Sequence, residues 1–344
     1  MIFRYDPDTD MLYIELVNIA SVESEEVVPG IVLDFDSSGR AVGIEINSVV
    51  RSHEGSRMDM WLKAILLVLV VLLVCMAGAV LYGVARWQVG TRELRARLEA
   101  ARRPIKPATY DVREIENLPL PIQRYFRAVL KDGQPVIADV RVSHEGQFNM
   151  GETEQKWNPF TSRQVVMTRR PGFDWDGRIR MAPGLYVLVH DAYIAGEGIL
   201  HAELLGLVTL ADIRGTPEAA QGELLRFLAE AAWYPTVLLP SQGVRWEAID
   251  DSSARATLQD GSNTVSLEFR FDAEGLISTV YAAVRYRTVN GTLVATPWQG
   301  KFWAYEVRDS MRIPLEGEVA WQLPEGPWPY WRGRINKIAY EFAR

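Results

Sequence analysis

The stretch from Ala64 to Ala85 reads AILLVLVVLLVCMAGAVLYGVA, and no charged residue interrupts these 22 positions. At about 1.5 Å of rise per residue, a helix of this length spans the roughly 30 Å hydrocarbon core of a bilayer. Thirteen of the residues are Leu, Ile or Val, each of which favours insertion by about 0.3 to 0.6 kcal/mol. Trp61, Tyr82 and Trp87 bracket the run as interfacial aromatic residues do. The stretch predicts one transmembrane helix that divides the chain into two unlike parts.

Charge is unevenly distributed over the 344 residues, whose formal net charge is −7. Residues 1–57 hold 4 basic and 11 acidic side chains, whereas residues 86–106 hold 7 basic and 2 acidic ones. The short basic segment suits anionic lipid head groups, at about 1 kcal/mol per Lys or Arg. The remaining parts are acidic, so we expect no nucleic acid as a partner. The apolar run and the basic segment after it predict a lipid bilayer as the partner. The single cysteine, Cys75, lies inside the apolar run and excludes an intramolecular disulfide.

The first 52 residues alternate in the manner of short strands, through MIFRYD, MLYIELV, IVLDFD and AVGIEI. This pattern predicts a small antiparallel sheet. The runs YDPDTDMLYIEL, SEEVVPGIVLDFD and GRAVGIEI resemble a family of small bacterial proteins, the domain of unknown function 2283. The resemblance implies a fold and no catalytic residue.

Two methionines, Met58 and Met60, come directly before the apolar run. A membrane protein that starts MDMWLKAILL would look complete. One hypothesis is therefore a gene fusion of two neighbouring reading frames, and the alternative is that residues 1–57 belong to the native product.

The region after the apolar run predicts three helical segments. A basic helical stalk at 88–107 is broken by prolines at its end. A second helix near 121–130 carries a core-facing stripe, and a third at 217–233 has Thr216 as its N-cap and Pro217 in its first turn.

From Val136 onward the hydrophobic pattern has a period of two, in runs such as VIADVRVSHEGQFNM, ILHAELLGLVTLADI and TVSLEFRFD. Turn dipeptides such as Asp260-Gly261 separate the runs. Successive hairpins around one central helix predict a large, curved, half-barrel-like antiparallel sheet. The fold class is thus mainly β (α+β).

The predicted organisation is a small β module at 1–52, a linker at 53–60, a transmembrane helix at 61–87, the stalk at 88–107 and a large β domain at 108–344. Long runs of the last part, among them WNPFTSRQVV, GFDWDGRIRMAPGLYVLVHDAYIAGEG and GEVAWQLPEGPWPYWRGRI, resemble a bacterial family of unknown function numbered 6544 or its close relative 6920. That resemblance covers roughly residues 115 to 342 and implies no activity. It does imply an N-terminal hydrophobic span.

No phosphate-binding glycine loop, paired-cysteine motif, metalloprotease helix or nucleophile elbow is present. We therefore expect no metal and no cofactor, and we assign no catalytic residue. An acid/base pair of His190 with Asp191 or Glu197 remains as a candidate for a membrane-tethered hydrolase. The segment Asp174-Trp175-Asp176 is either a carboxylate pair in a cleft or a hairpin turn, and the flanking Gly172 and Gly177 favour the turn.

Aromatic residues are abundant in the large domain. They either fill the concave side of the sheet against the helix or line an open cavity for an apolar ligand. The candidate ligand-binding residues are Trp175, Trp233, Tyr234, Trp246, Trp303 and Trp321. The favoured hypothesis is a membrane-anchored, non-catalytic binding domain for a lipid or another apolar ligand, similar in outline to the half-barrel lipid carriers of the bacterial envelope. The alternatives are the hydrolase and a scaffold that binds other envelope proteins.

Two arguments about orientation disagree. Seven basic residues after the apolar run place the large domain in the cytoplasm by the positive-inside rule. A lipid-binding role in the envelope requires the opposite side. We favour a single-pass protein of the cell membrane with its large C-terminal domain outside the cytoplasm.

Overall fold

The computed structural model describes residues 1–47, 57–151, 153–289 and 292–344. The chain splits into two compact units, Met1–Gly78 and Ala79–Arg344. Residues 48–52 of the predicted N-terminal module and 53–56 of the predicted linker lie outside the described residues.

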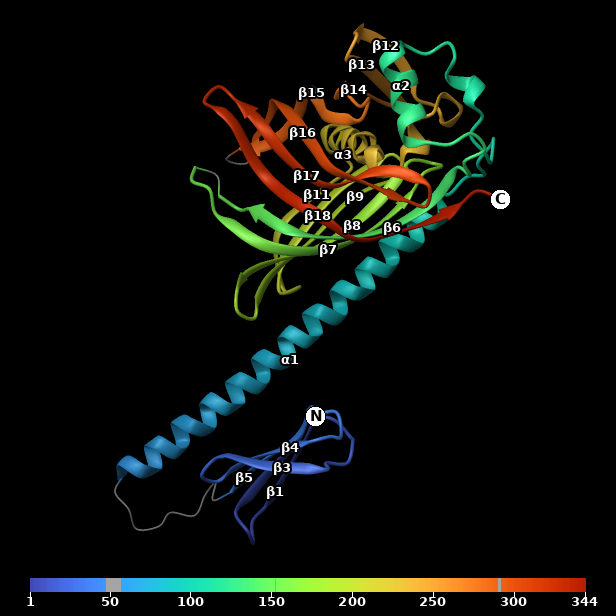
Figure 1. The fold of residues 1–344 in the computed structure, drawn as a ribbon. Coiled ribbons are helices and arrows are strands. Elements are labelled where there is room, and N and C mark those ends of the chain that lie inside the picture. Colours follow the sequence, from blue (N-terminus) through green and yellow to red (C-terminus); the bar gives the residue numbers. More distant parts are fainter. Residues whose placement is uncertain (48–56, 152, 290–291) are drawn as a thin grey trace. The chain divides into compact units, whose positions relative to one another are not determined.

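The N-terminal unit begins with a small sheet (blue in Figure 1), as predicted. Within residues 1–47 its five strands are antiparallel in the order β1-β2-β5-β4-β3. The strands are β1 (Ile2–Asp6), β2 (Met11–Glu15), β3 (Glu23–Val28), β4 (Ile31–Phe35) and β5 (Ala41–Asn47). Alternate residues of the inner strands face one side, where Ile14, Ile31, Ile44 and Ile46 are buried together.

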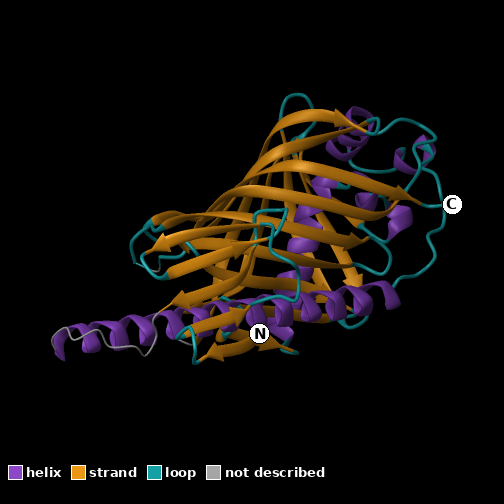
Figure 2. Ribbon diagram, turned by 90° about the horizontal axis from the view of Figure 1, so that it is seen from below, coloured by secondary structure: helices purple, strands orange, loops and turns teal. Residues whose placement is uncertain are grey.

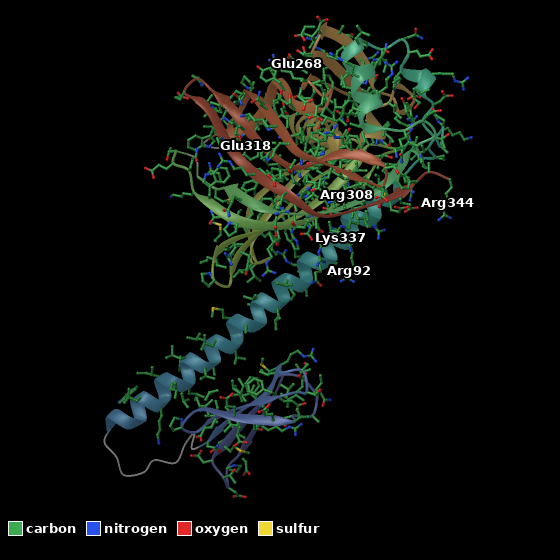
Figure 3. The ribbon with its side chains drawn as sticks, viewed as in Figure 1. Arg92, Glu268, Arg308, Glu318, Lys337 and Arg344 are labelled. Carbon is green, nitrogen blue, oxygen red and sulfur yellow. The ribbon has the colours of Figure 1, made fainter. Side chains whose placement is uncertain are left out.

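One uninterrupted helix, α1 (Arg57–Ala100), follows. Its most apolar 18-residue window has a mean hydropathy of 3.2, and none of that window is buried. By length and composition α1 is therefore able to cross a membrane. Beyond Gly78 the helix belongs to the second unit, where Leu94 and Leu98 are buried against the sheet. Arg92, labelled in Figure 3, lies on the exposed side of the same helix.

Among the described residues of the second unit, 13 strands form one antiparallel sheet in the order β11-β10-β9-β8-β7-β6-β18-β17-β16-β15-β14-β13-β12. It curves without closing into a barrel (Figure 2), which confirms the predicted half-barrel. The strands are β6 (Ile137–Asn149), β7 (Trp157–Met167), β8 (Gly172–Ala182), β9 (Leu185–Ile194), β10 (Glu197–Leu204), β11 (Val208–Arg214), β12 (Arg245–Asp250), β13 (Ser253–Asp260), β14 (Asn263–Phe271), β15 (Ile277–Val289), β16 (Thr292–Arg308), β17 (Met311–Leu323) and β18 (Gly326–Phe342).

The helix α3 (Pro217–Glu230) lies inside the curve of the sheet, as Figure 1 shows. Thr216 caps it, because the Thr216 hydroxyl oxygen accepts a hydrogen bond from the Ala219 N–H at 3.1 Å. The helix packs against β8, β9 and β10 on one side and β14 and β15 on the other. The remaining helical elements are η1 (Val112–Ile115), α2 (Leu120–Val129), η2 (Ala231–Trp233), η3 (Pro235–Leu238) and η4 (Pro240–Gln242).

Three glycines lie in one row across the middle of the sheet. Gly146 on β6 pairs with Gly333 on β18, which in turn pairs with Gly317 on β17. A Cβ atom on Gly333 would lie 2.4 Å from the Trp331 ring, so the absence of a side chain there lets that indole lie along its own strand. The row thus makes room for an aromatic ring on the concave face.

The sequence predicted a turn at Asp174-Trp175-Asp176, and this prediction was wrong. All three residues lie within β8, paired with β7 and β9. The neighbouring glycines do not end the strand, since Gly172 and Gly177 are themselves paired residues of β8. Their missing side chains serve packing, and a Cβ on Gly177 would meet the Trp175 ring at 2.1 Å.

Thr236 joins the loop after α3 to the first strand of the sheet. Its hydroxyl oxygen accepts a hydrogen bond from the backbone N–H of Ile137 at 3.0 Å, and both residues are fully buried. We expect Thr236→Val, which keeps the shape but removes the acceptor, to lower the free energy of unfolding by about 1 to 3 kcal/mol. Denaturant unfolding of the full chain in detergent, followed by tryptophan fluorescence, measures the change.

Thr288→Val is the matched control, because Thr288 is an exposed residue of β15. If both variants unfold at the same denaturant concentration, the Thr236 hydrogen bond does not stabilise the domain.

Candidate functional site

A cavity of about 120 Å³ lies between α3 and the concave face of the sheet. Its wall comes from both halves of the sheet and from α3, and it combines aromatic, aliphatic and charged residues. The aromatic residues that line it are Phe148, Trp175, Trp233, Trp298, Phe302, Tyr330 and Trp331. Their rings contact one another, for example Trp233 with Phe302 at 6.1 Å between centroids and Trp233 with Trp331 at 6.3 Å. The cavity is thus a largely apolar space enclosed by large, stiff side chains.

Charged side chains of α3 lie beside this aromatic wall. Glu223, Arg226 and Glu230 follow at i, i+3 and i+7, which places them on one face of the helix. Arg226 forms an ion pair with Asp191 of β9, and its Nε donates to Glu230 Oε1 at 2.7 Å. The guanidinium group also lies 5.3 Å from the centroid of the Trp175 ring. Arg226 therefore links α3 to the wall formed by β8 and β9.

Arg285 of β15 makes the corresponding link on the opposite wall. Its Nη2 donates to Glu223 Oε1 at 3.2 Å, and its Nη1 donates to the Tyr330 hydroxyl at 3.1 Å. The Trp298 indole N–H donates to the same hydroxyl at 2.9 Å. Nearby, Glu318 of β17 (labelled in Figure 3) accepts from Arg332 Nε at 2.5 Å and ties β17 to β18.

Burial shifts the titration of two groups near the cavity. Burial, together with the nearby charge of Asp191, raises the pKa of Glu223 from its usual 4.5 to about 8. Burial also lowers the pKa of His144 to about 3, with a contribution from the positive charge of Arg226. At neutral pH the Glu223 carboxyl is therefore mostly protonated and His144 is neutral. The Glu223 acid lies between the guanidinium groups of Arg226 and Arg285, and both of these arginines line the cavity.

Several buried polar atoms of these residues have no hydrogen-bond partner within the part of the chain that the structure describes. They are the indole N–H groups of Trp175 and Trp233, Nε2 of His144 and Oε2 of Glu223. Buried indole N–H groups normally find an acceptor. Of these residues only Trp175 and Trp233 line the cavity, so their two indole N–H groups are the donors closest to a molecule bound there.

The structure separates the six aromatic candidates named from the sequence. Trp175 and Trp233 line the cavity, and Trp321 lies next to it, stacked on Tyr330 at 5.5 Å. Tyr234 is fully buried and donates to the Phe227 carbonyl. The Trp246 indole donates to the Leu238 carbonyl at 2.9 Å.

The sixth candidate, Trp303, is 42% exposed and borders an open groove of about 730 Å³. The groove lies on the outer face of the sheet, since its Glu145 and Gln147 alternate with residues that face inward.

His190 does not meet Asp191 or Glu197 in the structure. His190 and Asp191 are neighbours on β9, so their side chains point to opposite faces of the sheet. Asp191 faces inward to Arg226, whereas Glu197 pairs with Arg97 of α1 at 2.6 Å. The acid/base pair proposed from the sequence is therefore not assembled.

His190 instead takes part in the contact between α1 and the outer face. Its Nδ1 lies 2.7 Å from Asp174 Oδ1, and its Nε2 lies 2.9 Å from the Thr91 hydroxyl. A hydroxyl, an imidazole and a carboxylate in series are the parts of a nucleophilic triad. Here the Thr91 hydroxyl donates to the Trp87 carbonyl at 3.0 Å, and Thr91 is buried where α1 packs on the sheet. The arrangement holds α1 and leaves no exposed nucleophile.

Within the described residues, no group of three or more His, Cys, Asp or Glu side chains is arranged to hold a metal ion.

Residues 116–340 match the profile of DUF6920, described as a family of unknown function. The chain belongs to this family. Residues 2–49 match a second profile, DUF2283, described as a protein of unknown function. Both resemblances seen in the sequence are confirmed. No curated protein matches the chain.

Two solved structures are similar to parts of the chain. The first is a LolA superfamily protein, NE2245, from Nitrosomonas europaea, at 10% identity and a TM-score of 0.35, covering 64% of this chain and 92% of that one. The second is a beta-barrel-like protein of the domain of unknown function DUF1849 from Brucella abortus, at 10% identity and a TM-score of 0.18, covering 60% and 98% respectively. Likenesses this distant carry no argument about function.

The residues that sequence reasoning missed are the charged ones, Glu223, Arg226 and Arg285. A signal was present for two of them. Glu223 and Arg226 lie at i and i+3, next to the apolar stripe that predicts α3, and with Glu230 they extend as a charged line along a helix otherwise expected to be buried. For Arg285 the sequence offers no signal, because its partners come from α3 and β18.

The raised pKa of Glu223 predicts how stability depends on pH. Between its unfolded pKa near 4.5 and its folded pKa near 8, the folded state holds a proton that the unfolded state has lost. The stabilisation is complete below the lower value and is lost as pH rises through the upper one, by at most about 1.4 kcal/mol per pH unit. We expect Glu223→Gln to remove this dependence, measured by denaturant unfolding from pH 5 to pH 8.8.

Glu218→Gln, at a carboxyl in the first turn of α3, serves as the control and should keep the wild-type slope. Parallel curves for the wild type and Glu223→Gln would show that Glu223 is ionised in the folded state.

Proposed function

We propose that this chain is a membrane-anchored binding protein whose large β domain holds an amphiphilic ligand in the cavity beside α3. One observation carries the proposal. The unpartnered indole N–H groups of Trp175 and Trp233 are buried, and both residues line a cavity whose exposed surface is largely apolar. A ligand with an apolar body and a hydrogen-bond acceptor, such as an ester or carboxyl group, would satisfy both features.

The size of the cavity limits what it accepts without rearrangement. About 120 Å³ is far more than the roughly 10–15 Å³ that a water molecule needs, and it is close to the roughly 150 Å³ of an engineered apolar cavity that binds benzene. A ring or a short alkyl segment fits this space. A longer acyl chain would have to displace side chains along the wall.

We also propose that α1 anchors the protein as a single-pass helix, with the small β module, linker, helix and large domain in the order predicted. The exposed apolar window supports this, because soluble proteins rarely expose apolar surface of that extent. A single anchor would keep the binding domain close to a source of amphiphilic ligands.

For orientation we propose that the large domain lies outside the cytoplasm. The basic residues after the apolar run have a structural role that is independent of topology. Arg86 pairs with Glu203 at 2.6 Å, Arg95 with Asp174 at 2.8 Å and Arg97 with Glu197 at 2.6 Å. Their number therefore reflects the contact between α1 and the sheet, which reduces the weight of the positive-inside argument.

Ala229→Phe tests the binding proposal by filling the cavity. Ala229 lines it from α3, and the added ring is about the size of benzene. We expect the full chain, purified in mild detergent and extracted with organic solvent, to release one amphiphile enriched over bulk lipid. Mass spectrometry should show this amphiphile reduced at least about tenfold in the variant, equivalent to about 1.4 kcal/mol of binding free energy.

Ala96→Phe makes the same substitution at an exposed position of α1 and should retain the ligand. Lipid bound around α1 contributes equally to all three samples. Identical extracts from the wild type and Ala229→Phe, with both proteins folded, would contradict a ligand in this cavity.

Labelling in intact cells tests the orientation. In a Cys75→Ala background, Ser262→Cys places one thiol in the exposed hairpin between β13 and β14. We expect a membrane-impermeant maleimide to label it without lysis if the large domain is outside the cytoplasm. Labelling only after lysis would place that domain in the cytoplasm.

A further inference from the structure

The turn between β10 and β11 is apolar and exposed. Residues 204–211 read LLGLVTLA, eight positions without a charge. Leu207, Val208 and Leu210 are 38%, 56% and 53% exposed. Their neighbours in the sequence are charged and paired: Glu203 with Arg86, and Asp212 with Arg214. On this hairpin the apolar surface is therefore confined to the tip.

This tip touches α1 inside the apolar run. A Cβ atom on Gly83 would lie 2.4 Å from the Leu205 carbonyl oxygen and 3.0 Å from the Leu207 side chain. A Cβ on Gly206 would lie 2.4 Å from the Gly83 carbonyl oxygen. The two backbones approach so closely because both positions are glycine. The tip therefore lies level with the last turn of the apolar run, which ends at Ala85.

Further contacts along α1 hold the tip at this level. Arg86 Nη2 donates to the Gly206 carbonyl at 2.7 Å and to Glu203 Oε2 at 2.6 Å. One residue on, the Trp87 ring stacks on His190 at 4.4 Å, and its N–H donates to Asp176 at 3.0 Å. Leu94 and Leu98 then pack among buried residues of the outer face. With contacts from Gly83 to Leu98, α1 cannot slide along the sheet without breaking ion pairs.

The neighbouring turn, between β8 and β9, has the same character. Residues 181–185 read MAPGL and carry no charge. This turn lies beside the first one, because the Leu205 N–H donates to the Tyr186 carbonyl at 2.9 Å. Just behind it on β8 are two exposed arginines, Arg178 and Arg180. Apolar turns with basic side chains just behind them are suited to a bilayer surface with anionic head groups.

We propose that the β10–β11 tip, Leu205–Leu210, inserts into the bilayer beside the end of the α1 span, with the β8–β9 tip at the head-group level. This inference rests on the proposed membrane anchoring of α1. The occupant is the lipid bilayer, since the tip contacts a residue of the apolar run and is continuous with its surface. The large domain is then held against the membrane at a fixed height and does not move freely on a tether.

Fluorescence quenching in liposomes tests this placement. The full chain in a Cys75→Ala background receives one cysteine, Val208→Cys, labelled with the fluorophore NBD. Leu72→Cys, in the apolar run, reports on anchoring, and Ile249→Cys, an exposed apolar position on the other edge strand β12, is the matched control. Liposomes of phosphatidylcholine and phosphatidylglycerol contain a lipid with a nitroxide near the head of its acyl chain.

We expect quenching and a blue-shifted emission at positions 72 and 208 and neither at position 249. Quenching at position 72 without quenching at 208 overturns the insertion of the tip and leaves the anchoring intact. An absence of quenching at position 72 overturns the anchoring and the inference that rests on it. Equal quenching at 208 and 249 overturns the specific role of the tip.

Discussion

The pairing of buried guanidinium groups governs the interior of the large domain. A charge taken out of water costs several kcal/mol unless it is matched by partners at good geometry. Arg226 meets this requirement with the carboxylates of Asp191 and Glu230, whereas Arg285 donates hydrogen bonds to two neutral acceptors, the protonated Glu223 carboxyl and the Tyr330 hydroxyl. Because these partners belong to both walls of the half-barrel, α3 is held between the walls at a defined separation.

That constraint also accounts for the cavity. Apolar side chains alone would pack to the density of an organic crystal and leave little space. Directional hydrogen bonds fix the positions of the polar groups, and the rigid indole rings cannot fill all the space that remains beside them. The row of glycines at Gly146, Gly333 and Gly317 gives Trp331 room to lie along its strand. The result is an aromatic space with unpartnered donors at its edge.

The same strands serve a second purpose on their other face. Alternate residues of β8 and β9 point in opposite directions, so Trp175 and Asp191 face the cavity while Asp174 and His190 face α1. One helix thus changes its surroundings along its length, from an exposed apolar run to a polar contact with the sheet. The ion pairs of Arg86 and Arg95 explain why basic residues follow the apolar run so closely.

Local patterns predicted much of this molecule correctly. The period-two runs predicted the strands of a curved sheet, and Thr216 with Pro217 indicated where α3 begins, because capping and periodicity depend on residues close together in the chain. The prediction of a turn at Asp174 was wrong because it relied on the local sequence alone. Glycine is typical of turns, but Gly172 and Gly177 are small here to admit Leu98 and the Trp175 ring, which the local sequence does not reveal.

By itself the sequence determined the apolar helix, the small N-terminal sheet, the mainly β class and the aromatic supply of the large domain. Only the tertiary structure decided which aromatic residues line a cavity, that His190 is paired with Asp174 and Thr91, and that Glu223, Arg226 and Arg285 meet inside the sheet. The physical reason is the separation along the chain between the residues that interact. Burial patterns and caps depend on neighbours along the chain, whereas the partners of a buried charge come together only in the tertiary fold. Arg285 of β15 and Glu223 of α3, for example, are 62 positions apart in the sequence.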